Sequence, residues 1–147
     1  MGLENMRGNN VKMRAATEND MTTIWELLQQ LSPFLPDRHD AREIWTRFVS
    51  QSHLFTCVAL VDGTLVGYGC GFVQTTIRGG SFFQIEEIVV ASTHQRMGIG
   101  GKIVAYLELS VASKNCYKAI LSADDKTVKF YERLGYSEVH KTFRKFL

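Results

Sequence analysis

The sequence predicts a single α+β domain whose central mixed, mostly antiparallel sheet is flanked by helices. Two apolar, β-branched runs joined by Asp62-Gly63 indicate an antiparallel hairpin, because that dipeptide favours a two-residue turn. A third strand-like run at residues 82–90 extends the hairpin into a meander. A long helix-like run then leads to a strand-like segment at residues 117–122, and a helical connection of this kind joins parallel strands.

The elements before the meander follow from the spacing of apolar residues. Residues 11–15 are predicted to form a short strand. After Thr17-x-x-Asp20, apolar residues recur at helical spacing until Pro33, which predicts a first amphipathic helix. The same period returns later and predicts a second helix that starts near Asp40. One strand and two helices therefore precede the meander.

The remaining elements complete the order. The hairpin strands are predicted at residues 54–61 and 64–73, with a glycine-containing loop at residues 75–81 before the third strand. A last helix is predicted at residues 127–134 because it ends before a glycine. Residues 137–147 are predicted to form a terminal strand.

Length and composition favour one globular domain at residues 11–147. The chain has 147 residues, of which 45% are hydrophobic and 22% charged, and a domain of this size buries about two-thirds of its unfolded surface. Residues 1–10 are expected to be a disordered lead without a secretory signal or membrane anchor. The net charge of +2 does not indicate a nucleic acid partner. Cytoplasm is the expected location, with organelle import left open.

The three cysteines, Cys57, Cys70 and Cys116, each lie in an apolar segment. Their odd number and wide spacing predict reduced core thiols in a reducing compartment rather than disulfides. They also lack the spacing of zinc ligands, so no metal is expected.

A glycine-rich stretch is the strongest functional signal, because it follows a strand-like run and opens a helix-like one. At such a helix start, unpartnered N–H groups and the helix dipole favour a pyrophosphate, and glycines allow its close approach. A P-loop is excluded, since Arg96 and Ile103 stand where it needs Gly and Ser or Thr. Ile103 also occupies the third glycine position of the dinucleotide fingerprint. Neither ATP nor NAD is the favoured ligand.

The stretch resembles the acetyl-CoA loop of the GNAT acetyltransferase superfamily, whose pattern is Gln/Arg-x-x-Gly-x-Gly or Ala. Gln95, Gly98 and Gly100 fit this pattern, and the order of elements is also that of the GNAT acyl-CoA N-acyltransferase fold. The resemblance implies that acetyl-CoA is the co-substrate and that its pantetheine arm lies where two strands splay apart. The residues implied to bind it are Ile88, Val89, Val90, Gln95, Arg96, Met97, Gly98, Ile99, Gly100, Gly101 and Tyr131.

The second half resembles, more narrowly, the glucosamine-6-phosphate N-acetyltransferases. That family typically has Gly-His-Ile-Glu-Asp-Val/Ile-Val-Val, then Cys-Tyr-Lys, then Asn-Val-x-Phe-Tyr. Residues 85–90, 116–118 and 128–131 match these motifs, without gaps between Glu86 and Gly135. The resemblance implies transfer of an acetyl group to the amine of D-glucosamine 6-phosphate, giving N-acetyl-D-glucosamine 6-phosphate for UDP-N-acetylglucosamine biosynthesis. It also implies a homodimer in which the partner supplies some contacts to the substrate.

Roles for individual residues follow from the same resemblance. Tyr131 would protonate the departing CoA thiolate, which suits a phenol with an ordinary pKa of about 10. Glu86 and the backbone at Ser122 would orient the amine, and amides of residues 88–90 would stabilise the oxyanion. Adjacent on a strand, Glu86 and Glu87 are expected on opposite faces, with Glu86 toward the sugar. The expected substrate-binding residues are Ser32, Glu86, Glu87, Tyr117, Lys118 and Arg144.

Two other functions remain open at this point. Ser122 and Thr127 replace the Asp and Asn that are usual in the family, and Glu87 replaces its second acid. A GNAT enzyme acting on a protein N-terminus, a polyamine or an arylalkylamine would share the whole CoA half. A non-catalytic acyl-CoA-binding module would share the fold, but it would have no need for the acid Tyr131.

Overall fold

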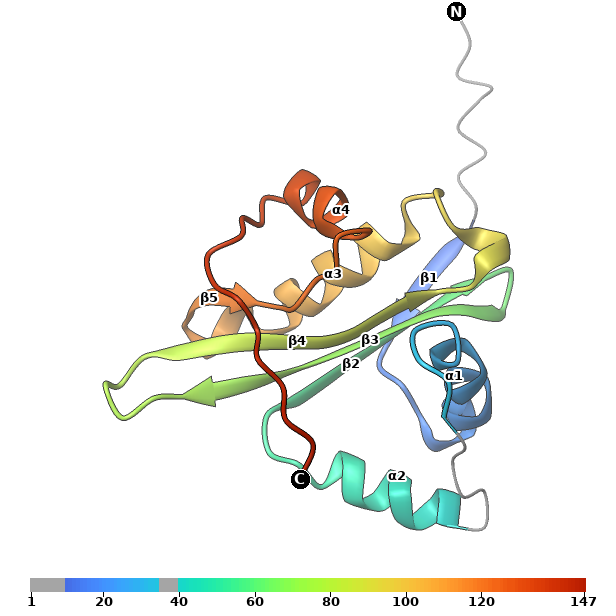
Figure 1. Cartoon of the computed structure of the whole chain (residues 1–147). Coiled ribbons are helices and arrows are strands. Elements are labelled where there is room, and N and C mark those ends of the chain that lie inside the picture. The colour runs from blue at the N-terminus through green and yellow to red at the C-terminus, as the bar shows by residue number, and fades with distance from the viewer. Residues whose placement is uncertain (1–9, 35–39) are drawn as a thin grey trace, which may run out of the picture.

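The computed structural model describes residues 10–34 and 40–147 (Figure 1). Within these residues, one five-stranded sheet has the order β1-β2-β3-β4-β5. The first three pairings are antiparallel and the β4–β5 pairing is parallel, which confirms the predicted mixed sheet. The strands are β1 (Val11–Arg14), β2 (Leu54–Val61), β3 (Thr64–Thr75), β4 (Ser81–Val90) and β5 (Cys116–Ile120). The predicted disordered lead at residues 1–9 lies outside the described residues.

The turns of the meander form as their residues predict. Asp62 and Gly63 have φ angles of 49° and 81°, the pair of positive values that a two-residue hairpin turn of this kind requires. Val61 therefore pairs directly with Thr64 across β2 and β3. The turn between β3 and β4 is closed by a hydrogen bond of 2.8 Å from the Thr76 N–H to the Gly80 carbonyl.

Helices cover both faces of the sheet. They are α1 (Met21–Leu28), α2 (Ala41–Val49), α3 (Ile99–Ser110) and α4 (Val128–Arg133), with short 3-10 turns at Glu18–Asp20, Ser92–His94 and Ala112–Lys114. Figure 1 shows α3 and α4 on one side of the sheet and α1 on the other. No helix in the described ranges is both long and apolar enough to cross a membrane.

A capping box fixes the 3-10 turn at Glu18–Asp20, which leads directly into α1. Asp20 Oδ2 accepts a hydrogen bond of 2.8 Å from the Thr17 N–H, and Thr17 is the residue that precedes this first turn. Arg14 at the end of β1 donates two further bonds to the same carboxylate, at 2.6 and 3.0 Å. These bonds tie the helix to the edge strand of the sheet. They also lower the pKa of the Asp20 carboxyl group, chiefly through the Arg14 bond.

The core has two parts, one on each face of the sheet. On the α3 side, Phe83, Ile103 and Leu107 are almost completely buried. The α1 side contains Ile24 and Val58, together with neighbours from β3 and β4. Glycines of β3 allow α3 to approach closely, because a Cβ at position 69 would lie 2.7 Å from a methyl carbon of Ile103. Two of the cysteines, at positions 57 and 70, are buried free thiols, as predicted, and Cys116 is half-buried.

The predicted terminal strand is wrong. Residues 137–147 have no regular structure, and Figure 1 draws them as an irregular trace without an arrow. Their backbone pairs with no strand of the described sheet, and an isolated extended segment has no ladder to stabilise it. Large apolar side chains of this segment are exposed, including Phe143 at 90% and Phe146 at 82%. Alternating apolar residues alone therefore do not secure a strand here.

Candidate active site

The parallel strands β4 and β5 separate part-way along their length. Their pairing includes Ser81 with Cys116 and Gln84 with Ile120, and it stops there, while β4 continues to Val90. A bulge in β4 coincides with the separation, because Gly71 pairs with Ile85 whereas the next paired residue, Gly69, faces Ile88. Bulges bend a strand and increase its twist. The backbone of residues 85–90 thus has β3 on one side and no β5 partner on the other, as predicted.

The bulge places two glutamates next to each other. In a regular strand, residues three positions apart lie on opposite faces of the sheet. Ile85 and Ile88 nevertheless both pack on the α3 side, because the bulge adds one residue between them, where Glu86 and Glu87 lie. The expectation that these two side chains alternate between opposite faces is therefore wrong. Partial burial of the Glu87 carboxyl group and the nearby charge of Glu86 raise the pKa of Glu87. Burial, together with the charges of both carboxylates, also raises the pKa of the Cys70 thiol.

The glycine loop lies at the end of β4 and opens α3. Arg96 and Gly98 have positive φ angles of 61° and 77°, so the chain turns sharply before Ile99 begins the helix. The Gln95 side chain holds the loop to the strand, since its Nε2 donates a bond of 3.2 Å to the Val90 carbonyl. A Cβ built on Gly98 would meet nothing within 4 Å, which leaves open space above the loop. This open helix start suits an anionic group.

Gly100 has a different surrounding from Gly98. A Cβ there would lie 3.1 Å from Cζ of Phe130, so this glycine lets the ring of α4 pack against the first turn of α3. The sequence assigned Gly100 only to ligand binding. The structure adds a packing role, which holds α4, the helix that carries Tyr131, against the first turn of α3.

Tyr131 lies in an aromatic cluster on α4. Its ring centroid is 4.9 Å from that of Phe130 and 6.0 Å from that of Tyr136. The Tyr136 hydroxyl donates a bond of 2.8 Å to Glu108 of α3, which ties this cluster to the longer helix. Burial, followed by the negative charge of Asp124, raises the pKa of Tyr131. The phenol therefore keeps its proton at neutral pH.

The other predicted site residues divide into two groups. Ser122 lies just beyond the last β4–β5 pair, at the mouth of the gap, and its Oγ is 3.0 Å from Thr142 Oγ1. Lys118 lies instead beside the rings of Phe82 and Tyr117, with its Nζ 5.6 and 5.2 Å from their centroids. This is the opposite end of β4, about 13 Å along the strand from Glu86. One chain does not bring Tyr117 and Lys118 to the glutamates.

Arg144 and Ser32 lie in two different parts of the fold. Arg144 is in the irregular C-terminal segment, where its guanidinium carbon is 4.7 Å from the Phe146 ring centroid. Ser32 is exposed after α1, the helix on the sheet face opposite α3. Tyr131 packs against the α3-side core that contains Ile85 and Ile99, whereas Ser32 follows a helix on the other face of the sheet.

Sequence reasoning missed Asp124, which holds the loop between β5 and α4. Its Oδ1 accepts bonds from the backbone N–H groups of Lys126 and Thr127, both at 3.1 Å. The available signal was an aspartate in the loop before the predicted helix, because Asp side chains often accept hydrogen bonds from backbone N–H groups two or three residues on. Among the described residues, no group of three or more His, Cys, Asp or Glu side chains is arranged to hold a metal ion.

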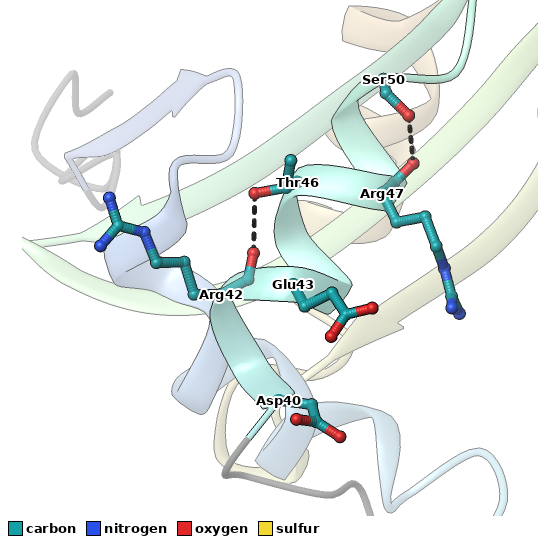
Figure 2. Close-up of a pocket in the computed structure, with 6 residues that line it drawn as sticks. All are labelled: Asp40, Arg42, Glu43, Thr46, Arg47 and Ser50. Carbon is teal, nitrogen blue, oxygen red and sulfur yellow. Dashed lines mark hydrogen bonds between the residues drawn. The ribbon is translucent and has the colours of Figure 1, made fainter.

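A separate hollow of about 670 Å³ lies along the outer face of α2 (Figure 2). Figure 2 shows Arg42 and Arg47 pointing away from each other, with Glu43 between them. The hydroxyls of Thr46 and Ser50 are already used, because each donates a bond of 2.8 Å to a carbonyl of the helix. The hollow therefore has no convergent polar groups for a ligand.

Comparison with known proteins agrees with the site described above, in which an open helix start follows a strand that has separated from its neighbour. The sequence profile of the Acetyltransferase (GNAT) family matches residues 21–136. The chain belongs to this family. A Trypanosoma brucei protein named glucosamine 6-phosphate N-acetyltransferase is 33% identical over 84 residues, which cover 56% of this chain and 57% of that protein. A Dictyostelium discoideum protein named glucosamine 6-phosphate N-acetyltransferase 1 is 30% identical over 116 residues, 76% of this chain and 74% of the relative.

The fold is shared with solved structures as well. The crystal structure of glucosamine-6-phosphate N-acetyltransferase from Arabidopsis thaliana superposes with a TM-score of 0.85 at 24% identity. The superposition covers 92% of this chain and 97% of the plant chain. At this identity the likeness establishes the fold, and it confirms the mixed, mostly antiparallel sheet with flanking helices predicted from the sequence.

Proposed function

We propose that this acetyltransferase moves the acetyl group of acetyl-CoA to the amine of D-glucosamine 6-phosphate, giving N-acetyl-D-glucosamine 6-phosphate for UDP-N-acetylglucosamine biosynthesis. The observation that carries the proposal is the open glycine loop that follows the unpaired end of β4, and the packing of α4, which carries Tyr131, against the first turn of the helix that this loop opens. The names of the relatives, at 33% and 30% identity, support the choice of acceptor.

The gap offers two surfaces to acetyl-CoA. Backbone groups of Ile88, Val89 and Val90 lie where β5 no longer pairs, so the pantetheine arm can bond there as an added strand. The first-turn amides of α3, from Ile99 to Gly101, have no partner within the helix and are available to the pyrophosphate. Arg96 is exposed beside them and adds positive charge.

The reaction needs an acceptor amine without its extra proton. We assign Glu86 and Glu87 to attract the ammonium form and to pass its proton to water. The neutral nitrogen then attacks the thioester carbon, and backbone N–H groups at the end of β4 stabilise the oxyanion. The C–S bond breaks, Tyr131 gives its proton to the departing sulfur, and the nitrogen loses its second proton to water, so that the products are the neutral amide and CoA thiol. The tyrosine phenolate recovers a proton from solvent.

Ser122 contributes differently from the aspartate that it replaces. Its hydroxyl lies within hydrogen-bond distance of Thr142, so in this arrangement the backbone at position 122, rather than a charged side chain, faces the acceptor. A GNAT enzyme with another amine acceptor is the second candidate, and this missing carboxylate is the observation that favours it.

We further propose that a second subunit completes the phosphate side of the site. Tyr117, Lys118 and Arg144 are the cationic and aromatic groups assigned to the substrate, and in one chain Tyr117 and Lys118 lie toward the opposite end of β4 from the glutamates. The exposed apolar side chains of residues 137–147 give a dimer a surface to bury. A homodimer would thereby bring the partner's cations to the gap.

The test is release of CoA thiol from acetyl-CoA, measured in parallel with four acceptors. We expect release with glucosamine 6-phosphate and little with glucosamine, a polyamine or a short peptide. Release with another amine alone would reject the sugar phosphate but keep the acetyltransferase. If none of the four acceptors gave thiol release although CoA binding was measurable, the result would favour the non-catalytic acyl-CoA-binding module.

A further inference from the structure

The loop between β5 and α4 is organised by one side chain, Asp124. Its Oδ1 accepts three hydrogen bonds, from the N–H of Lys126 at 3.1 Å and from the N–H and Oγ1 of Thr127 at 3.1 and 3.0 Å. Its carbonyl accepts a further bond of 3.2 Å from the Val128 N–H. This is the bond set of a helix N-cap, although the regular part of α4 starts only at Val128.

The capped turn leads directly to the proposed acid. The Thr127 carbonyl accepts a bond of 3.2 Å from the Tyr131 N–H, so the residue that Asp124 holds in turn holds Tyr131. The regular part of α4 has six residues, and so short a helix is unstable unless its ends and one face are fixed. The packing of Phe130 against α3 fixes one face of α4. The hydrogen bonds to Asp124 fix the start of the helix.

The charge of Asp124 acts on the same tyrosine. After burial, this carboxylate is the cause that raises the pKa of Tyr131, because a negative neighbour disfavours the phenolate. The other titratable groups facing this phenol come from the aromatic cluster. They are Tyr136, whose ring is 6.0 Å away, and, behind it, Glu108 and the half-buried Tyr106 of α3. Glu108 is engaged by Tyr136, so Asp124 is the charged group that acts directly on Tyr131.

We propose that Asp124 is a positioning residue for Tyr131: it caps the turn that leads into α4 and thereby holds the phenol in place beside its own carboxylate. The proposal rests on the proposed function, because it gives Tyr131 the role of the acid. It adds a residue outside the motifs that carry the family resemblance. It also explains how a side chain on a six-residue helix is held in one place.

The test separates the cap from the charge. Asp124→Asn keeps an oxygen that accepts the same bonds but removes the charge, whereas Asp124→Ala removes both. Asp125→Ala is the matched control, since this exposed neighbour makes no hydrogen bond or ion pair with the described residues. In Asp124→Ala we expect kcat to fall roughly 10- to 100-fold with the KM for acetyl-CoA within about twofold. In Asp124→Asn we expect kcat at pH 7 within about threefold of wild type.

The pH dependence distinguishes the outcomes. We expect the alkaline limb of kcat to move to lower pH in Asp124→Asn, because removing the negative neighbour lowers the pKa of the phenol. Ultraviolet titration of the unliganded protein, compared with the same variant carrying Tyr131→Phe, should show the same shift for the phenol. Wild-type kcat in Asp124→Ala, or an unshifted phenol in Asp124→Asn, would overturn the proposal. Full activity of Tyr131→Phe alone would instead overturn the acid role on which it rests.

Discussion

The glycine loop yields the sharpest prediction, because the chain contains a matched control for it. Gly98 has a φ of 77° and Gly63 a φ of 81°, and a Cβ at either position would meet nothing within 4 Å. Replacing either by alanine therefore introduces the same backbone strain without a steric clash. The cost of a left-handed residue with a Cβ is about 1–2 kcal/mol. For a domain of this size, that lowers Tm by about 2–8 °C in both variants.

Only one of the two variants should affect ligand binding. The methyl group of Gly98→Ala would stand at the open helix start to which we assign the pyrophosphate, whereas Gly63→Ala changes the tip of the β2–β3 hairpin. We expect the Kd for acetyl-CoA to rise roughly tenfold in Gly98→Ala, equivalent to about 1.4 kcal/mol. In Gly63→Ala it should equal the wild-type value.

Isothermal titration calorimetry at a temperature where both variants are fully folded measures this difference. The equal loss of stability then cancels, so a change in Kd reports on the loop alone. Unchanged affinity in Gly98→Ala, with the expected loss of Tm, would show that the open space above the loop does not take the pyrophosphate. A weaker affinity in both variants would attribute the effect to strain rather than position.

Two further predictions concern the acid and the cap of α1. Tyr131→Phe should lower kcat roughly 100-fold or more with the Kd for acetyl-CoA within about twofold, measured by thiol release and calorimetry; wild-type kcat would remove the acid role. Asp20→Asn should cost about 0.5–1 kcal/mol at pH 7, a value reduced because Arg14 is 43% exposed. Since bonding to Arg14 lowers the Asp20 pKa below its unfolded value, this stability is present above the unfolded pKa and is lost as pH falls through the folded one. Urea denaturation should therefore give equal stabilities at pH 2 and a difference at pH 7.

Local patterns in the chain determine much of the fold. Asp62-Gly63 specifies a turn whose two residues both take positive φ, and this sets the register of β2 on β3. Apolar periodicity correctly places α1 and α2, and Gly98 before Ile99 marks the start of α3. These features were predictable because each depends on neighbours within a few residues.

The composition of the site was predictable only in part. Gln95, Gly98 and Tyr131 were identified from spacing and resemblance, and they lie on elements that meet at one gap. The arrangement of Glu86 and Glu87 was not, because a bulge depends on how β4 pairs with β3 and leaves no mark in the alternation of apolar residues.

The sequence by itself determined the helices, the hairpin and the glycine loop, since hydrogen bonds between near neighbours and the freedom of glycine decide them. Only the tertiary structure decided that Phe130 packs over Gly100, because this contact joins two helices that are distant in the chain. It also decided that residues 137–147 form no strand in a single chain. A strand exists only when another strand satisfies its backbone, and which partner is present is a property of the assembled sheet rather than of the segment.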